Sequence, residues 1–315
     1  MQRALLFPGQ ASQFVGMGAD LLANDAPSRE LAARAEARLG LPLARLCSAG
    51  PLPELTETRH AQPAILLVSL ACLDYLARRG LEPSVVAGHS LGEYAALVAA
   101  GVLDPLDALE LVALRGRLMF ESGVKQPGTM AAVVGLAIGQ VESCCEQAAQ
   151  GEVVQLANIN SPEQIVISGA VAAVERAMAA CRSAGAKKVI PLAVSGAFHS
   201  ALMASAAARL GDALKDKPFA DAAVPVIPNV TAQPTTEGAK LRRLLVEQLT
   251  RPVRWTESMQ CLRELDGGEA LELGPGQVLA GLMRRIDREA RVTAMGDIAA
   301  METWLSQAAS FKEAP

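Results

Sequence analysis

The spacing of hydrophobic positions along the chain alternates between short continuous runs and helical periods, which predicts an α/β protein. Short apolar runs predict buried strands at residues 3–7, 84–87, 224–227 and 270–273. Apolar residues three and four positions apart predict helices at 28–39, 62–76, 91–100, 104–119 and 239–249, and a last helix that ends near Ile286. Residues 51–57 show neither pattern and predict a loop. Strands that alternate with helices in this way favour a parallel sheet.

The middle of the chain has a different order of elements. Strand patterns at 130–136, 153–157, 164–168 and 187–194, with helical patterns at 138–149 and 171–184, follow one another as βαββαβ. This order is typical of a ferredoxin-like unit. We therefore expect a small subdomain at 127–194, inserted into a discontinuous core made of residues 1–126 and 195–315.

Composition narrows the classes of function. The chain has 315 residues and a net charge of −4, with both signs scattered, so we expect neither nucleic acid nor membrane as a partner. No apolar run approaches the roughly 18 residues that a membrane span needs. The N-terminal segment is too soon broken by Pro8 and Gly9 to be a secretory signal. We expect a cytoplasmic monomer.

The cysteines give no sign of metal chemistry. The six cysteines have no Cys-x-x-Cys spacing and do not cluster with any of the three histidines. We expect buried thiols, with no metal site and no bound cofactor.

The main chemical signal is the pentapeptide Gly88-His89-Ser90-Leu91-Gly92, which matches Gly-x-Ser-x-Gly. A predicted strand enters it and a predicted helix leaves it, so Ser90 is expected on a sharp turn at the carboxyl edge of the sheet. Backbone N–H groups at the helix start, that of Leu91 among them, can face an oxyanion. The loop after the first strand is where such folds place a second donor. The alternative is an ordinary loop serine between glycines.

A serine nucleophile needs a base, and only three histidines are available. His60 has no polar or glycine-rich neighbours. His89 adjoins Ser90 on an extended segment, so its side chain is expected to point away and to pack under the turn. His199 lies in a loop where the chain returns to the core, and it is the preferred base. No carboxylate stands out as a third member, so a backbone or amide carbonyl, with Gln248 as a possible source, is expected to orient the imidazole.

Arg115 is the second informative residue. Its neighbours three and four positions away on the predicted helix are apolar, so its stem is expected among hydrophobic side chains. A guanidinium held there needs an anion, and its fork suits a carboxylate. The site would then select acyl groups with a free carboxyl. The alternatives are a structural ion pair or an arginine whose head reaches solvent.

Several motifs occur in an order that matches one protein family. They are Phe7-Pro8-Gly9-Gln10-Ala11-Ser12-Gln13, Gly88-His89-Ser90-Leu91-Gly92-Glu93-Tyr94, Leu114-Arg115-Gly116-Arg117, Asn158-Ile159-Asn160-Ser161-Pro162, Phe198-His199-Ser200, Pro252-Val253-Arg254-Trp255 and Glu272-Leu273-Gly274-Pro275-Gly276. With these motifs the chain resembles the malonyl-CoA:acyl-carrier-protein transacylases of fatty-acid synthesis and the related acyltransferase domains of polyketide synthases. The resemblance implies an α/β-hydrolase-like core with a ferredoxin-like insertion.

The resemblance also implies a reaction. Ser90, deprotonated by His199, would take the malonyl group from malonyl-CoA and pass it to the phosphopantetheine thiol of holo acyl-carrier protein. Backbone N–H groups of Gln10 and Leu91 would hold the oxyanion, and Arg115 would pair with the malonyl carboxylate.

Further roles follow from the same likeness. Gln248 corresponds to the residue that orients the histidine and lines the site. Asn160 corresponds to a position near the CoA or pantetheine arm. Phe198, together with the leucine after the serine, resembles the forms that select malonyl. The chain departs from the family at Ala11, where glycine is usual, and an alanine there is strained if the position needs a positive φ.

Two other classes of function stay open at this stage. A thioesterase or an editing hydrolase would use the same serine and histidine, although it would have no carboxylate for Arg115 to bind. A non-catalytic subunit could keep the fold and bind a carrier protein, although it would not need Ser90, His199 and Arg115 together.

Overall fold

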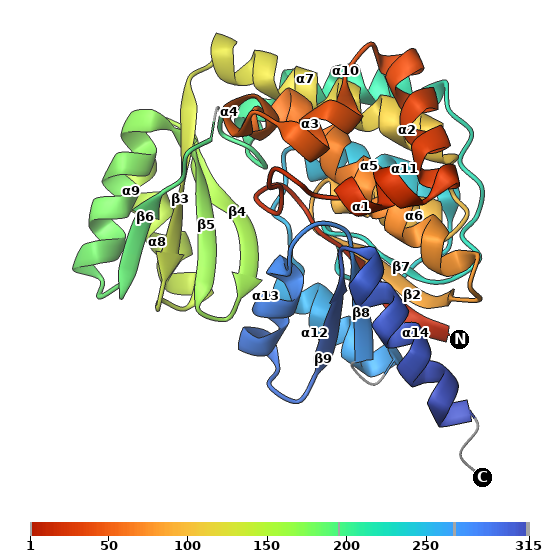
Figure 1. Cartoon of the computed structure of the whole chain (residues 1–315). Coiled ribbons are helices and arrows are strands. Elements are labelled where there is room, and N and C mark those ends of the chain that lie inside the picture. Colours follow the sequence, from red (N-terminus) through yellow and green to blue (C-terminus); the bar gives the residue numbers. More distant parts are fainter. Residues whose placement is uncertain (1, 195, 267–268, 313–315) are drawn as a thin grey trace.

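The computed structural model describes residues 2–194, 196–266 and 269–312, which contain two separate sheets (Figure 1). The larger sheet is parallel throughout and has the strand order β7-β2-β1-β8-β9. Its strands are β1 (Gln2–Phe7), β2 (Glu82–Gly88), β7 (Val226–Ile227), β8 (Glu269–Leu273) and β9 (Arg291–Met295). The predicted parallel sheet is confirmed, and β9 adds an edge strand that was not predicted.

The smaller sheet is antiparallel, with the order β4-β5-β3-β6. It is built from β3 (Gly128–Val134), α8 (Ile138–Ala149), β4 (Val154–Ser161), β5 (Gln164–Ala170), α9 (Val171–Ser183) and β6 (Lys188–Pro191). The βαββαβ order is confirmed. The division of the chain into a core of 1–126 and 195–315 and a subdomain of 127–194 stays a prediction.

The side chains of β3 show how the two sheets meet. Ala131 and Val133 point into the cluster that α8 and α9 cover, whereas Met130 and Ala132 point into the main core. Because side chains alternate along a strand, one face of the small sheet carries its own helices and the other faces the large sheet's layer. Met130, on this second face, lines the cavity described below.

The remaining helices surround the parallel sheet (Figure 1). They are α1 (Ala19–Asn24), α2 (Ala26–Leu39), α3 (Leu43–Ala49), α4 (Leu52–Thr56), α5 (Thr58–Ala77), α6 (Gly92–Ala99), α7 (Pro105–Lys125), α10 (Ala204–Lys215), α11 (Gly238–Gln248), α12 (Trp255–Asp266), α13 (Val278–Ile286) and α14 (Ile298–Lys312), with a 3₁₀ turn at Ala201–Met203. The loop predicted at 51–57 is wrong, since α4 occupies it. Burial of the Leu55 side chain stabilises this short helix. A helix of five residues that depends on packing against the rest of the chain is too short to show a periodic hydrophobic pattern.

The helix α5 lies at the centre of the main core. It begins four residues before the predicted start, because Pro63 is accommodated inside the helix rather than at its beginning. Among the described residues it is the one helix with the length and apolar composition of a membrane span, and 78% of that window is buried inside the protein.

Candidate active site

Ser90 lies on the turn between β2 and α6 and has a left-handed backbone, with φ of 54°. Glycines on both sides make this turn possible. A Cβ on Gly88 would lie 2.0 Å from the carbonyl of Gly92, and a Cβ on Gly92 would lie 2.2 Å from the carbonyl oxygen of Phe7. The predicted strand, sharp turn and helix around Ser90 are therefore present, and the turn is packed directly against the end of β1.

The Ser90 hydroxyl is hydrogen-bonded to a histidine. Its Oγ lies 2.8 Å from Nε2 of His199, and Nδ1 of the same ring lies 2.7 Å from the backbone carbonyl oxygen of Gln248. A carbonyl can only accept, so Nδ1 carries the proton and Nε2 offers its lone pair to the Ser90 hydroxyl. The expected carbonyl partner of the imidazole is thus the main chain of Gln248.

Burial keeps this imidazole neutral. The His199 side chain is 4% exposed, and burial together with the nearby charge of Arg115 lowers the pKa of His199 to about 3. The hydrogen bond to the Gln248 carbonyl acts in the opposite direction but is the weaker effect. At neutral pH the ring can accept a proton from Ser90.

Arg115 projects from α7 into the same place and is fully buried. Its Nη2 donates to Ser90 Oγ at 3.0 Å and to Gln248 Oε1 at 3.0 Å, and its Nη1 donates to Gln62 Oε1 at 2.7 Å. All three acceptors are neutral, and the buried Nε has no hydrogen-bond partner among the described residues. In the part of the chain that the structure describes, the guanidinium thus has neutral hydrogen-bond acceptors and no carboxylate among them.

A buried carboxyl, Glu93, lies behind this group. Its Oε2 accepts from the Gln248 side-chain amide at 2.8 Å and from the backbone N–H of Asn229 at 2.9 Å. Burial raises the pKa of Glu93 to about 7, against these hydrogen bonds and the charge of Arg115. The Gln248 side-chain amide thus bridges the two groups: its Oε1 accepts from Arg115 and its Nε2 donates to Glu93.

Sequence reasoning missed three members of this network, namely Gln62, Glu93 and Asn229. A charge inside the apolar run of the helix after the elbow could have drawn attention to Glu93. Gln62 and Asn229 carry no local signal, because only the folded chain brings them to Ser90.

A cavity of about 260 Å³ opens above Ser90 and His199. Gln10 and Leu91, the two predicted oxyanion donors, both line it, and Phe198 and Met130 form part of its apolar wall. Ala11, also in its lining, has φ of 82°, so the position does require the left-handed backbone that glycine adopts more readily.

Two further predicted residues have different surroundings. Asn160 does not line this cavity, and its Oδ1 lies 2.8 Å from Nε2 of His89. The His89 ring in turn packs edge-on against Trp255, with ring centroids 5.3 Å apart. His89 also lines the cavity that contains Ser90, so its expected position under the turn stays a prediction. His60 lies apart from the site, with Nδ1 3.0 Å from the carbonyl oxygen of Glu54.

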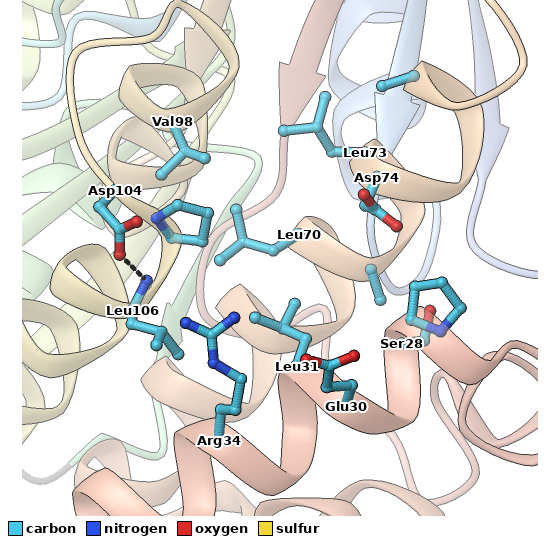
Figure 2. A pocket seen from close by; sticks show the side chains of 14 residues that line it. Ser28, Glu30, Leu31, Arg34, Leu70, Leu73, Asp74, Val98, Asp104 and Leu106 are labelled. Atoms are coloured by element: carbon cyan, nitrogen blue, oxygen red, sulfur yellow. Dashed lines mark hydrogen bonds between the residues drawn. The ribbon is translucent and has the colours of Figure 1, made fainter.

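A second cavity, of about 410 Å³, lies between α2, α5 and the start of α7. Figure 2 shows Leu31, Leu70 and Leu106 around it, and the carboxylate of Asp104 bonded to the backbone N–H of Leu106. Asp104 is therefore occupied as the N-cap of α7. No histidine is among the described residues that line this cavity, whereas His199 lines the smaller one beside Ser90.

Ser90 on its elbow, a neutral imidazole aimed at its oxygen and a buried arginine define a serine-dependent enzyme of the α/β class that acts on acyl groups. A family model described as an acyl transferase domain matches residues 4–300. The chain belongs to this acyl transferase family.

Two relatives are similar in sequence to this chain over nearly its whole length. The malonyl CoA-acyl carrier protein transacylase of Escherichia coli K12 is 44% identical over 301 residues, which is 95% of this chain and 97% of that protein. The enzyme of the same name from Haemophilus influenzae is 46% identical over 299 residues, covering 94% and 96%.

Solved structures show the same fold. A malonyl-transacylase solved in complex with its type II polyketide acyl-carrier protein superposes with a TM-score of 0.93 at 43% identity, covering 98% of this chain and 100% of that one. The malonyl CoA-acyl carrier protein transacylase of Coxiella burnetii gives a TM-score of 0.93 at 40% identity, covering 96% of each chain.

Proposed function

We propose that this protein transfers the malonyl group from malonyl-CoA to the phosphopantetheine thiol of holo acyl-carrier protein, through a malonyl ester on Ser90. The donor and the acceptor are those for which its relatives are named. The reaction supplies extender units for fatty-acid or polyketide synthesis.

In the first half-reaction, His199 Nε2 takes the proton of the Ser90 hydroxyl as Oγ attacks the thioester carbonyl. Negative charge builds up on the carbonyl oxygen, which the backbone N–H groups of Gln10 and Leu91 would receive. The C–S bond then breaks, and the CoA thiolate leaves with the proton that His199 holds. The product is a malonyl ester on Ser90.

In the second half-reaction the same residues act on the carrier. His199 removes the proton from the pantetheine thiol, and the sulfur attacks the ester carbonyl. The ester C–O bond breaks, and Ser90 Oγ recovers its proton from His199. Malonyl has moved from one thioester to another, so little free energy is gained or lost and the reaction is reversible.

Arg115 carries the choice of acyl group and is the single observation behind this proposal. It is a fully buried cation whose three hydrogen-bond acceptors among the described residues are all neutral, and it is hydrogen-bonded to the nucleophile itself. The free carboxylate of a malonyl group would provide the missing anion in bidentate geometry. Phe198 and Leu91 would shape the wall around the short acyl chain.

A hydrolase with the same serine and histidine is not favoured, because the family and its named relatives are transferases. The two activities differ in the fate of the ester. Purified protein loaded with radiolabelled malonyl-CoA is freed of excess donor and divided between buffer and holo acyl-carrier protein. If the protein is a transferase, the label should appear on the carrier within the dead time of mixing, and the malonyl ester should be stable in buffer. Rapid release of the label as free malonate in both samples would favour hydrolysis.

We further propose that the protein works as a cytoplasmic monomer without a bound cofactor. The Ser90, His199 and Arg115 groups come from one chain, so the proposed chemistry needs no second subunit. Asn160, whose Oδ1 contacts the cavity-lining His89, is proposed to lie near the CoA or pantetheine arm.

A further inference from the structure

Asn229, in the loop after β7, bridges the two residues on which the elbow turns. Its side-chain Oδ1 accepts from the backbone N–H of Ser90 at 2.7 Å, and its Nδ2 donates to the backbone carbonyl oxygen of Gly88 at 2.6 Å. The residue is fully buried. One amide group therefore closes a ring of hydrogen bonds around the peptide segment that carries the nucleophile.

The turn that carries Ser90 has a strained backbone and buried main-chain groups that must be hydrogen-bonded. A left-handed backbone at a residue with a Cβ is unfavourable, and so is a buried backbone N–H or C=O without a partner. The segment from Gly88 to Ser90 offers one donor and one acceptor toward Asn229. Only a side chain with both a donor and an acceptor at fixed spacing can satisfy the two together.

The orientation of the Asn229 amide is itself fixed. The main chain of Asn229 is held at both ends, by its N–H to Glu93 Oε2 at 2.9 Å and by its carbonyl oxygen from the N–H of Arg254 at 3.0 Å. The Gln248 amide adds a contact to Oδ1 at 3.3 Å. Glu93 lies on α6, the helix that leaves the elbow, so the loop is tied to the far side of the same turn.

We propose that Asn229 is a positioning residue for acyl transfer: it holds the Ser90 backbone in the conformation that directs Oγ at His199 and the Leu91 N–H at the substrate carbonyl. Asn229 touches no reacting atom and does not line the described cavity. The inference deepens the proposed function, because it rests on Ser90 being the nucleophile.

This role predicts that replacing Asn229 lowers the acylation rate constant and leaves substrate binding nearly unchanged. Both the attack and the oxyanion contact depend on the elbow, so acylation slows whatever the acyl group is. A displacement of about 1 Å can lower a rate about 100-fold. We expect Asn229→Ala to lower the acylation rate constant about 100-fold for malonyl-CoA and for acetyl-CoA alike, with KM changed less than about threefold.

The matched control is Ser258→Ala. Ser258 is fully buried and donates to the carbonyl oxygen of Arg254 at 2.9 Å, so this variant removes one buried hydrogen bond close by without touching the elbow. We expect it to lose stability and to keep the acylation rate. Thermal melting and circular dichroism are recorded for each variant.

A second variant, Asn229→Asp, keeps the proposal falsifiable if the alanine variant does not fold. Ionised aspartate still accepts from the Ser90 N–H but cannot donate to Gly88, whereas protonated aspartic acid does both. The charged and titratable groups facing this position are Glu93 on α6, Arg115 on α7 and His199 in the loop before the 3₁₀ turn. Relative to wild type, Asn229→Asp should regain acylation as pH falls from 8 to 6.

Labelling of Ser90 by a fluorophosphonate is the common readout, since it needs neither malonyl-CoA nor a carrier protein. A wild-type protein that accepts the probe but forms no malonyl ester would refute the proposed donor and leave the test of Asn229 intact. A folded Asn229→Ala protein labelled within about threefold of wild type would overturn the inference. So would an Asn229→Asp protein whose relative rate does not change with pH.

Discussion

Ser90 Oγ and His199 Nε2 lie 2.8 Å apart although the two residues are 109 positions apart in the chain. Both residues have left-handed backbones, with φ of 54° and 55°. Two strained turns, one after β2 and one after the small sheet, thus present their side chains to each other. Left-handed residues with a Cβ are uncommon, and strain of this kind gathers at sites where geometry matters more than stability.

Replacement of Arg115 tests acyl selection. We expect Arg115→Ala to weaken malonyl transfer by about 2 to 5 kcal/mol in kcat/KM, the scale for truncating one partner of a buried charged pair, and to affect acetyl transfer much less. Arg115→Lys is the matched control, because it keeps the charge and loses the fork. Steady-state rates with both thioesters check this, and equal losses for the two would make Arg115 structural.

The acidic limb of the pH profile tests the state of His199. An ordinary histidine is protonated below about pH 6.5 and then cannot act as a base. Because the pKa of His199 is lowered to about 3, kcat/KM for acylation should not fall as pH decreases from 6.5 to 5. Single-turnover acylation across this range measures it. An inflection near 6.5 would show that the ring is more solvated than the structure has it.

Glu93 predicts a pH dependence of stability. Its pKa is raised from 4.5 to about 7 in the folded protein, so the folded state holds the proton more tightly than the unfolded state. The contribution of protonated Glu93 to the free energy of unfolding is fully present below about pH 4.5. It is lost as pH rises through 7, which lowers the free energy of unfolding by up to about 3 kcal/mol. Denaturant unfolding of wild type and Glu93→Gln at several pH values isolates this contribution. The difference between the two proteins should change between pH 5 and 8, and a constant difference would contradict it.

Ala11 predicts a stabilising substitution. Its φ of 82° is unfavourable for a residue with a Cβ, and its side chain is exposed, so its removal leaves no hole. Ala11→Gly should raise the free energy of unfolding by about 1 kcal/mol. Ala33→Gly, on the exposed face of α2, is the control and should lower it by a similar amount. A loss of stability in both variants would refute strain at position 11.

The parts of the fold that the sequence predicts are those with a local signal. The βαββαβ order has one periodic pattern for each element, and the elbow has two glycines whose missing side chains the structure explains. Short helices such as α3 and α4 were not predicted, because burial of a few residues by the rest of the chain stabilises them. The edge strand β9 was also missed.

The active site also contains residues that a local motif predicts and contacts that no local motif predicts. Ser90, His199 and Arg115 belong to motifs, and the structure brings them together. The contact of Asn160 with His89, and the bridge from Glu93 through Gln248 to Arg115, depend on distant segments meeting. No pattern within either segment indicates such meetings.

The most direct test of the account is the location of the acyl group. Wild-type protein and Ser90→Ala are mixed with malonyl-CoA, quenched in acid, and examined by intact mass and then by peptide mapping. We expect one malonyl increment on wild type, mapped to Ser90, and none on Ser90→Ala. An increment that persists in Ser90→Ala, or that maps to another residue, would contradict it.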